Sequence, residues 1–439
     1  MGVPTAHIAQ DRAVEFTRAT GAHFFDRRRF SASLMAALAL ARLEPVFPQG
    51  PDAGGATSSA PAPFGRSPRW FGFNLLEYFS TDPDWMKYFP YRNDGMFRED
   101  DFRWTSDWGF NFARLPMDYR FWTARDDSMK IDERKLEPID RAIRLGERYG
   151  VHINIGLHRA PGYCILDSLD ARVTGIRVTK EKTNLWTDSS AQDAFLHQWT
   201  VLAQRYKSIA GDHLSFNLLN EPKIFSTRDG ASLQTGRGED GGADTGDQEA
   251  GTQGAKTYMR IMQATIECIR NIDPDRQIVV DGFDVATEPL WELNIDDVIQ
   301  SAHDYYPDAV TVCEAEWARG EETTALPAWP MANGPNKHAI GRDDVEARLL
   351  PWKKLGANNV PIHFGEMGCY KHTPPQVVLA WFDDALDVIN EVRSGWALWN
   401  FRGPFGVLDT ERRGTRFQDW HGHLLDRPLL DLLQKKMRT

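Results

Sequence analysis

The segment SFNLLNEPK, residues 215–223, is a short apolar run that ends abruptly in Asn220, Glu221 and Pro222. A run of this kind, bounded by turn-forming residues, predicts a buried β-strand. A carboxylate at the end of a buried strand needs a partner, because burial disfavours an unpaired charge. The segment therefore predicts that Glu221 acts together with groups supplied by other strands of the fold.

Seven further apolar runs occur along the chain, and helix-length amphipathic stretches separate several of them. The runs begin near residues 70, 110, 152, 278, 297, 360 and 394, and the helical stretches cover 135–150, 191–207 and 255–272. Strands that alternate with helices pair in parallel. Eight such units predict an α/β fold of the (β/α)8 TIM-barrel type. A doubly wound open sheet is the alternative, and the lack of a Gly-rich phosphate loop after the first run disfavours it.

The first 68 residues differ in composition from the rest. Residues 1–47 contain Arg27, Arg28 and Arg29 before an uncharged segment at 31–41, which resembles a twin-arginine export signal. A basic amphipathic helix is the alternative for this region. Residues 48–68 are rich in Pro, Gly, Ala and Ser, which is typical of a linker. We expect residues 69–439 to form one catalytic domain that is exported to the periplasm or secreted, without a membrane anchor in the mature protein.

Charge and cysteine content narrow the possible functions. The formal net charge of −11 argues against a nucleic-acid partner, which would require a basic surface, and suits a neutral substrate. The four cysteines show no CxxC spacing, so a zinc site of that type is not expected. Buried free thiols are the expectation, and a single disulfide stays open. The tail at 420–439 is predicted to be the closing helix of the barrel, and the protein is expected to be a monomer.

Active sites of (β/α)8 barrels lie at the C-terminal ends of the strands. Six of the eight predicted strands end in polar, titratable or aromatic groups, which core packing alone does not explain. These groups are Arg114, His158, Asn220 with Glu221, His303 with Tyr305, Glu366 and Trp399. The sequence therefore predicts that these residues converge on one rim of the barrel.

Glu221 and Glu366 end the fourth and seventh strands, which face each other across a barrel mouth. Glycoside hydrolysis requires two carboxyl groups that flank the scissile bond, one as acid and one as nucleophile or base. Two like charges close together also separate their pKa values, so that one group stays protonated near neutral pH. We therefore predict that Glu221 and Glu366 are the catalytic pair.

The remaining strand-end residues are predicted to bind the substrate or to support the two carboxylates. Asn220 would hold a sugar hydroxyl, Arg114 would keep the nucleophile ionised, His303 and Tyr305 would orient the carboxylates, and Trp399 would lie under the reacting sugar ring. His158 is assigned to the same supporting group. Each of these residues also has a structural alternative, as a hydrogen-bonded core group, a salt bridge or a filler of the barrel mouth.

The ordered set of motifs resembles glycoside hydrolase family 5, a family of cellulase-like, retaining (β/α)8 glycosidases. LLNEP (218–222) is similar to the family's acid/base segment and HFGEMG (363–368) to its nucleophile segment. The other matching segments are WFGFNLLEYF (70–79), FARLPMD (112–118), GLHRAPGY (156–163), SAHDYYP (301–307) and GWALWNF (395–401). The resemblance spans residues 70 to about 406.

The resemblance implies a double-displacement mechanism, with Glu366 as nucleophile and Glu221 as acid/base, and no metal or organic cofactor. It implies a β-linked glycan substrate, and an endo-β-1,4-glucanase is the first expectation. An exo-acting β-glycosidase or a mannan- or xyloglucan-active enzyme is the alternative within the family. A non-catalytic carbohydrate-binding barrel and a metal-dependent barrel hydrolase are alternatives of other classes. Arg159, the YCILDS segment (163–168) and the long loops at 223–254 and 308–337 depart from the family's best-known cellulases and leave the substrate open.

Overall fold

A computed structural model of the chain describes residues 69–88, 96–169, 171–174, 176–223, 245–293, 295–315, 317, 327–332 and 339–438. The predicted export signal (1–47) and linker (48–68) lie outside these residues, and both stay predictions. Among the helices of the described residues, none combines the length and the apolar composition that crossing a bilayer requires.

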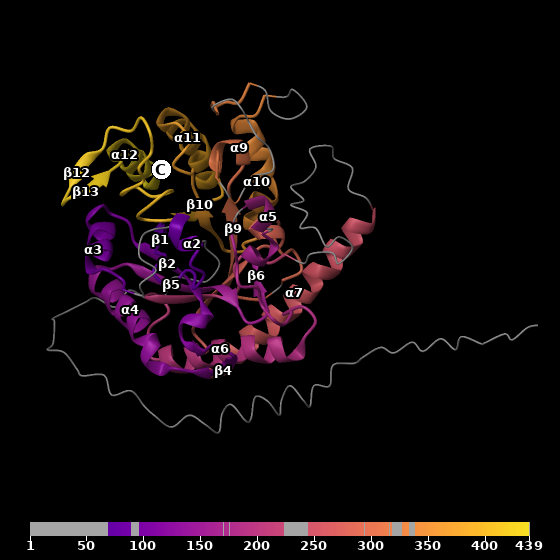
Figure 1. The fold of residues 1–439 in the computed structure, drawn as a ribbon. Coiled ribbons are helices and arrows are strands. Elements are labelled where there is room, and N and C mark those ends of the chain that lie inside the picture. Colours follow the sequence, from indigo (N-terminus) through magenta and orange to yellow (C-terminus); the bar gives the residue numbers. More distant parts are fainter. Residues whose placement is uncertain are drawn as a thin grey trace, which may run out of the picture. The chain divides into compact units, whose positions relative to one another are not determined.

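Eight parallel strands close into a barrel with helices around it (Figure 1). The strands are β1 (Phe71–Asn74), β2 (Phe112–Asp118), β5 (His152–Ala160), β7 (Leu214–Asn217), β8 (Gln277–Asp281), β9 (Val298–Asp304), β10 (Ile362–Met367) and β11 (Gly395–Leu398). Each pairs with the next in chain order, and β11 pairs with β1, so the sheet has no open end among these strands. All eight lie in the predicted runs, which confirms the (β/α)8 fold and excludes the open sheet.

The predicted helices are present at the expected places. They are α4 (Glu137–Tyr149), α6 (Ser189–Tyr206) and α7 (Thr245–Ile272). α4 stops at Gly150 because this residue adopts a left-handed conformation, with φ of 65°, which glycine accommodates without strain. The other helices are α2 (Trp85–Tyr88), α3 (Glu99–Asp107), α5 (Ala171–Thr174), α8 (Phe283–Ala286), α9 (Asp308–Thr311), α10 (Arg342–Ala357), α11 (Pro375–Glu391) and α12 (Arg427–Met437).

The C-terminal tail differs from the single closing helix predicted for 420–439. A two-stranded antiparallel hairpin, β12 (Gln418–Trp420) with β13 (His423–Leu425), comes first. The closing helix, α12, begins only at Arg427. The side chain of Asp426 accepts a hydrogen bond from the backbone N–H of Leu429 at 3.2 Å, and this cap fixes where the helix starts.

The barrel strands are buried on both faces. Every residue of β2, β5, β9 and β10 is buried, which explains why these strands are continuous apolar runs and not alternating patterns. A short antiparallel strand, β6 (Tyr163–Cys164), extends the sheet beyond β5. The cysteines, Cys164, Cys268, Cys313 and Cys369, are buried free thiols as expected, and the disulfide that the sequence left open does not form.

The contact between β1 and β2 requires a glycine at position 72. A Cβ atom there would lie 1.8 Å from the backbone oxygen of Phe112, the residue that pairs with Gly72 across the two strands. We predict that Gly72→Ala lowers the free energy of unfolding by about 3 kcal/mol, because the strands must separate. Gly341→Ala is the control, since its Cβ would meet Pro330 at an ordinary 3.5 Å. Equal denaturant midpoints for the two variants would contradict the prediction.

Candidate active site

Arg114 on β2 lies at the centre of the mouth and connects four strands. Its guanidinium group is 1% exposed. It donates hydrogen bonds to Asn217 at 2.9 Å, Asn74 at 2.9 Å, Asn220 at 2.7 Å and Glu366 at 2.6 Å. A planar guanidinium with five N–H donors suits such a ring of acceptors, and a lysine would not satisfy them. Arg114 therefore fixes the positions of both the Asn220 amide and the Glu366 carboxylate.

Glu366 on β10 is held from two sides. Its Oε1 accepts from Arg114, and its Oε2 accepts from the hydroxyl of Tyr305 at 3.1 Å. Its side chain is 4% exposed. Burial raises the pKa of Glu366 to about 7, although His303 and Arg114 act in the opposite direction. The neighbouring Gly365 allows this packing, because a Cβ there would lie 2.7 Å from the hydroxyl of Ser301.

Glu221 follows β7 in a strained backbone conformation, with φ of 47°. Its backbone N–H donates to the carboxylate of Asp281 at 3.0 Å, and its carbonyl accepts from the hydroxyl of Tyr163 at 2.5 Å. These two contacts hold the turn in place. Burial and the negative charge of Asp281 raise the pKa of Glu221 to about 8, against the attraction of Arg114.

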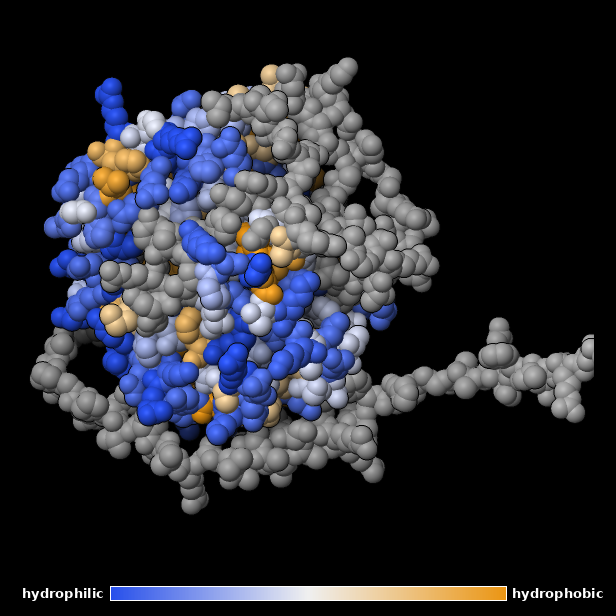
Figure 2. Space-filling model, viewed as in Figure 1, coloured by the Kyte–Doolittle hydropathy of each residue, from blue (hydrophilic) through white to orange (hydrophobic). Residues whose placement is uncertain are grey.

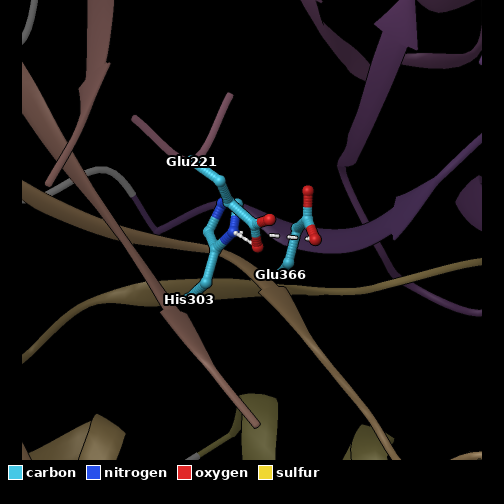
Figure 3. A group of neighbouring side chains, drawn as sticks. All are labelled: Glu221, His303 and Glu366. Carbon is cyan, nitrogen blue, oxygen red and sulfur yellow. Dashed lines mark hydrogen bonds and ion pairs between the residues drawn. The ribbon is translucent and has the colours of Figure 1, made fainter. Parts of the chain in front are cut away.

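His303 on β9 lies between the two carboxylates (Figure 3). Its Nδ1 is 2.9 Å from Oε1 of Glu221 and 3.6 Å from Oε2 of Glu366. Burial lowers the pKa of His303. One oxygen of each carboxylate and one ring nitrogen of His303 lie within 4.8 Å of one another. The two carboxyl groups are therefore close enough to act on one bond.

The spacing of these three ligand atoms would also accept a divalent cation. The charge around them argues for a different use. The Arg114 guanidinium already contacts Oε1 of Glu366, so a fixed positive charge supplies what a metal ion would supply. We interpret the group as a hydrogen-bonded acid–base cluster.

His158 and Trp399 lie together at the mouth, outside the hydrogen-bonded group. Their rings are 5.8 Å apart, and the ring of Phe79 contacts both, at 4.5 Å from His158 and 5.3 Å from Trp399. Burial lowers the pKa of His158 well below its usual range. The structure thus brings Arg114, Asn220, Glu221, His303, Tyr305 and Glu366 into direct contact, while His158 and Trp399 lie in an aromatic group beside them.

Sequence reasoning missed several residues of the site. Asp281 ends β8, and applying the strand-end rule to that strand as well would have found it. Asn74 and Asn217 are the last residues of β1 and β7, so the same rule applied to these bounds would have found them too. Tyr163 belongs to β6, which no apolar run predicted, so its contact with Glu221 is visible only in the folded chain.

The long loops are only partly described. Of the loop at 223–254, residues 224–244 lie outside the described residues, and the remainder begins α7. The loop at 308–337 starts with α9 and is otherwise described only at 312–315, 317 and 327–332. The expectation that these loops shape the substrate site stays a prediction.

Comparison with known proteins agrees with this geometry. The family model for cellulase, glycosyl hydrolase family 5, matches residues 64–403. Endoglucanase C of Acetivibrio thermocellus is 23% identical over 349 residues, which cover 73% of this chain and 88% of the relative. A solved glycoside hydrolase is 32% identical with a TM-score of 0.69, covering 84% of this chain and 99% of that one. Endoglucanase Cel5A of Thermotoga maritima, 20% identical with a TM-score of 0.59 over 83% of this chain and 97% of its own, shares the fold.

The raised pKa of Glu221 predicts a specific dependence of stability on pH. The pKa rises from 4.5 to about 8 on folding, so the folded state retains a proton that the unfolded chain releases between these values. The stabilisation from this carboxyl group is present below pH 4.5 and is lost as the pH rises toward 8. Glu221→Gln cannot ionise at this position. Its melting temperature should therefore exceed that of the parent by about 2 °C or more at pH 8, and this difference should be smaller at pH 5.

Thermal melts at the two pH values check this expectation. Glu147→Gln, a change of an exposed carboxylate on α4, is the matched control and should show no such trend. A melting temperature of Glu221→Gln that falls below that of the parent as the pH rises would show that the carboxylate, once ionised, is well compensated in the fold.

Proposed function

This chain belongs to glycosyl hydrolase family 5, the cellulases, and we propose that it hydrolyses a β-linked glucan with retention of anomeric configuration. It is a glycosidase that acts on O-glycosyl bonds, and its substrate is a glycan. The observation that carries the proposal is the approach of the Glu221 and Glu366 oxygens to within 4.8 Å. Retaining enzymes place their carboxyl groups about 5 Å apart, whereas inverting enzymes need about 6.5 Å or more to admit a water molecule.

The surroundings of the two carboxylates support different roles. Arg114 and Tyr305 direct N–H and O–H donors at Glu366, which favours its ionised form and suits a nucleophile. Glu221 has the higher pKa and accepts no guanidinium hydrogen bond among the described contacts, which suits the proton donor. The hydrogen bond from Arg114 to Asn220 supports a role for Asn220 in binding a hydroxyl next to the reacting carbon.

The reaction then proceeds in two displacements. An oxygen of Glu366 attacks the anomeric carbon while Glu221 gives its proton to the departing glycosidic oxygen, so one C–O bond forms and one breaks. Water next attacks the anomeric carbon of the glycosyl-enzyme, Glu221 takes a proton from that water, and the bond to Glu366 breaks. Both carboxyl groups end in their starting protonation states.

An endo-acting β-1,4-glucanase is the first candidate. The similarity to endoglucanase C over 88% of that relative supports this substrate class. A glucan chain is uncharged, which agrees with the acidic net charge of the protein. Trp399, beside the carboxylates, offers a flat apolar face for a sugar ring, although only 6% of the residue is exposed.

That low exposure favours a second candidate, an exo-acting enzyme or one restricted to short oligosaccharides. We define the mouth cluster as Leu76, Phe79, Trp85, Ile176, Ala315, Tyr370, Trp399 and Phe405. These residues come from segments after β1, β5, β9, β10 and β11, and all are buried. Figure 2 shows small groups of hydrophobic side chains, one near the centre and one at the upper left of the face drawn in Figure 1, among hydrophilic side chains. An endo-acting enzyme needs a groove open at both ends, and the packing of Trp399 into this buried cluster leaves little of its ring free to stack on an internal sugar.

Arg159, which departs from the family's familiar pattern, holds two segments of that mouth together. It forms ion pairs with Asp82 at 3.4 Å, Asp167 at 3.0 Å and Glu181 at 3.1 Å. Asp82 follows β1, whereas Asp167 and Glu181 lie in the segment between β6 and α6. Because this guanidinium is buried and engaged by three carboxylates, the two segments are held together as a fixed part of the fold.

Three further expectations concern regions and properties outside the active site. We propose that residues 1–47 direct export by the twin-arginine route, that residues 48–68 connect this region to the barrel, and that the enzyme acts as a monomer in the periplasm or outside the cell. The Arg27–Arg29 run, followed by an uncharged segment, supports the first part.

Product analysis on a glycan panel tests the activity. The panel holds carboxymethyl-cellulose, mixed-linkage glucan, xyloglucan, mannan, laminarin and aryl β-glycosides. We expect hydrolysis of at least one β-glucan by the full chain and a loss of at least about 10³-fold in kcat for Glu366→Ala, with partial recovery when azide replaces the missing nucleophile. The product should keep the β-configuration in proton NMR spectra recorded before mutarotation. An α-configured first product would contradict the retaining mechanism.

The same assay separates the alternatives of other classes. Activity unchanged by a strong chelator is expected, and its loss would favour a metal-dependent hydrolase. Binding of glucan without hydrolysis, equal in parent and Glu366→Ala, would favour a non-catalytic carbohydrate-binding barrel.

The mouth cluster predicts how products form. If it closes one side, the parent should release short products from chain ends and reduce the viscosity of polymer solutions little. Trp85→Ala removes a buried member of the cluster and should raise the rate on polymer relative to oligosaccharide severalfold. Trp420→Ala, in the C-terminal hairpin where its ring lies 5.5 Å from that of Trp108, is the matched control. A rapid fall of viscosity with the parent would instead favour the endo-acting enzyme.

A further inference from the structure

Asp281, at the end of β8, has no assigned role and lies directly behind the acid–base pair. It is 0% exposed. One carboxylate oxygen, Oδ1, accepts from the Asn217 amide at 2.8 Å, and the other, Oδ2, accepts from the backbone N–H of Glu221 at 3.0 Å. Among the described residues, no lysine or arginine lies within 4.0 Å of it. A buried negative charge is thus placed against the acid and kept there by neutral donors.

The second contact of Oδ2 is with the histidine between the two catalytic carboxylates. Nε2 of His303 lies 3.4 Å from Oδ2 of Asp281. This nitrogen is buried and has no hydrogen-bond partner of normal geometry among the described residues. The opposite ring nitrogen, Nδ1, is 2.9 Å from Oε1 of Glu221. Asp281, His303 and Glu221 therefore form a chain in which the imidazole bridges two carboxyl groups.

We propose that Asp281 is a positioning residue that fixes the tautomer of His303 and thereby keeps the acid proton on Glu221. A neutral imidazole carries one N–H. With the hydrogen on Nε2, its positive end lies near the Asp281 carboxylate, 3.4 Å from Oδ2, and Nδ1 presents a lone pair that can only accept from a protonated Glu221. With the hydrogen on Nδ1, the lone pair of Nε2 would face the negative oxygen of Asp281. The first arrangement is favoured because it avoids that repulsion.

This arrangement serves both displacements of the proposed mechanism. In the first, Glu221 begins protonated and gives its proton to the leaving oxygen. The Glu221 carboxylate then faces the Nδ1 lone pair, with the negative charge of Asp281 behind the imidazole, which makes it a better base toward the incoming water. The proton returns to Glu221, and His303 keeps its own N–H throughout.

The other charged and titratable groups around this chain do not supply the same effect. Those that face Glu221 or His303 are Arg114, His158, Tyr163, Lys223, Tyr305, His363 and Glu366. Arg114 favours an ionised Glu221, and Glu366 is engaged by Arg114 and Tyr305. The backbone N–H of Lys223 bonds the Tyr163 hydroxyl, and its ammonium pairs with Asp284 at 2.8 Å. Asp281 is the carboxylate that contacts both the backbone of the acid and its histidine.

The inference rests on Glu221 being the acid, as proposed above, and its first test needs no substrate. Nitrogen NMR of histidine-labelled full-length protein reports each tautomer, and the His303 signal is assigned by its loss in His303→Gln. We expect the hydrogen on Nε2 at pH 6 to 7. A hydrogen on Nδ1, or a doubly protonated ring, overturns the proposal whatever the enzyme's substrate.

The second test uses Asp281→Asn, which keeps an acceptor for the Glu221 backbone but removes the charge. In the pH profile of kcat/KM, the apparent pKa of the alkaline limb should fall by about one pH unit or more, because Glu221 loses its proton more easily. The rate on a phenyl β-glycoside, whose leaving group needs a proton, should fall at least about tenfold. The rate on a dinitrophenyl β-glycoside, which leaves without help, should change by less than about threefold.

A general structural defect would lower the rates on both glycosides together and leave the alkaline limb of kcat/KM unchanged. That outcome overturns the proposal. Asp304→Asn is the control, since Asp304 is also a buried carboxylate at a strand end but bonds only the backbone N–H of Tyr306 among the described contacts. It should leave the ratio of the two rates unchanged. If Asp281→Asn does not fold, the tautomer measurement on the parent decides alone.

Discussion

The buried guanidinium of Arg114 is the constraint on which the mouth of the barrel depends. A cation that is 1% exposed must find an acceptor for nearly every N–H, and it finds them on or directly after three other strands, β1, β7 and β10. Removing any one acceptor would leave a buried donor unsatisfied, so the register of those strands and the direction of Glu366 are determined together. The Glu366 carboxylate is held in place because the buried charge of Arg114 is stabilised by a negative partner at that position.

Burial is also what makes the two carboxyl groups chemically useful. Each has a pKa raised mainly by loss of water, to about 8 for Glu221 and about 7 for Glu366. In water both groups would be ionised at neutral pH, and neither could donate a proton. Burying the two carboxyl groups lowers the stability of the fold but keeps one proton available for catalysis. The strained backbone of Glu221 adds to this cost in stability.

The sequence predicted what depends on local pattern, and it missed what depends on contacts between distant segments. All eight strands were found because buried parallel strands are apolar along their length, and the strand-end rule located Glu221 and Glu366. The prediction that the second strand ends near Arg114 was wrong, because β2 continues to Asp118 and Arg114 is its third residue. Tyr163 could not be found, because its strand of two residues carries no periodicity. The hairpin before α12 was missed since Leu424 and Leu425 in its second strand continue smoothly into the apolar pattern of the helix. Asp281 is 60 residues from Glu221, and only closure of the barrel brings them together.

The hydrogen bond from Tyr163 to the carbonyl of Glu221 limits how this enzyme can diversify. Tyr163 belongs to the segment that follows β5, and segments of this kind usually vary freely between members of a barrel family. Here that segment also supports the turn that carries the acid, and its ring packs against Trp186. Exchanging it to acquire a new substrate would disturb proton transfer at the same time. New specificities are therefore more accessible through the segments after β1 and β9, where substitutions do not act directly on the Glu221 backbone.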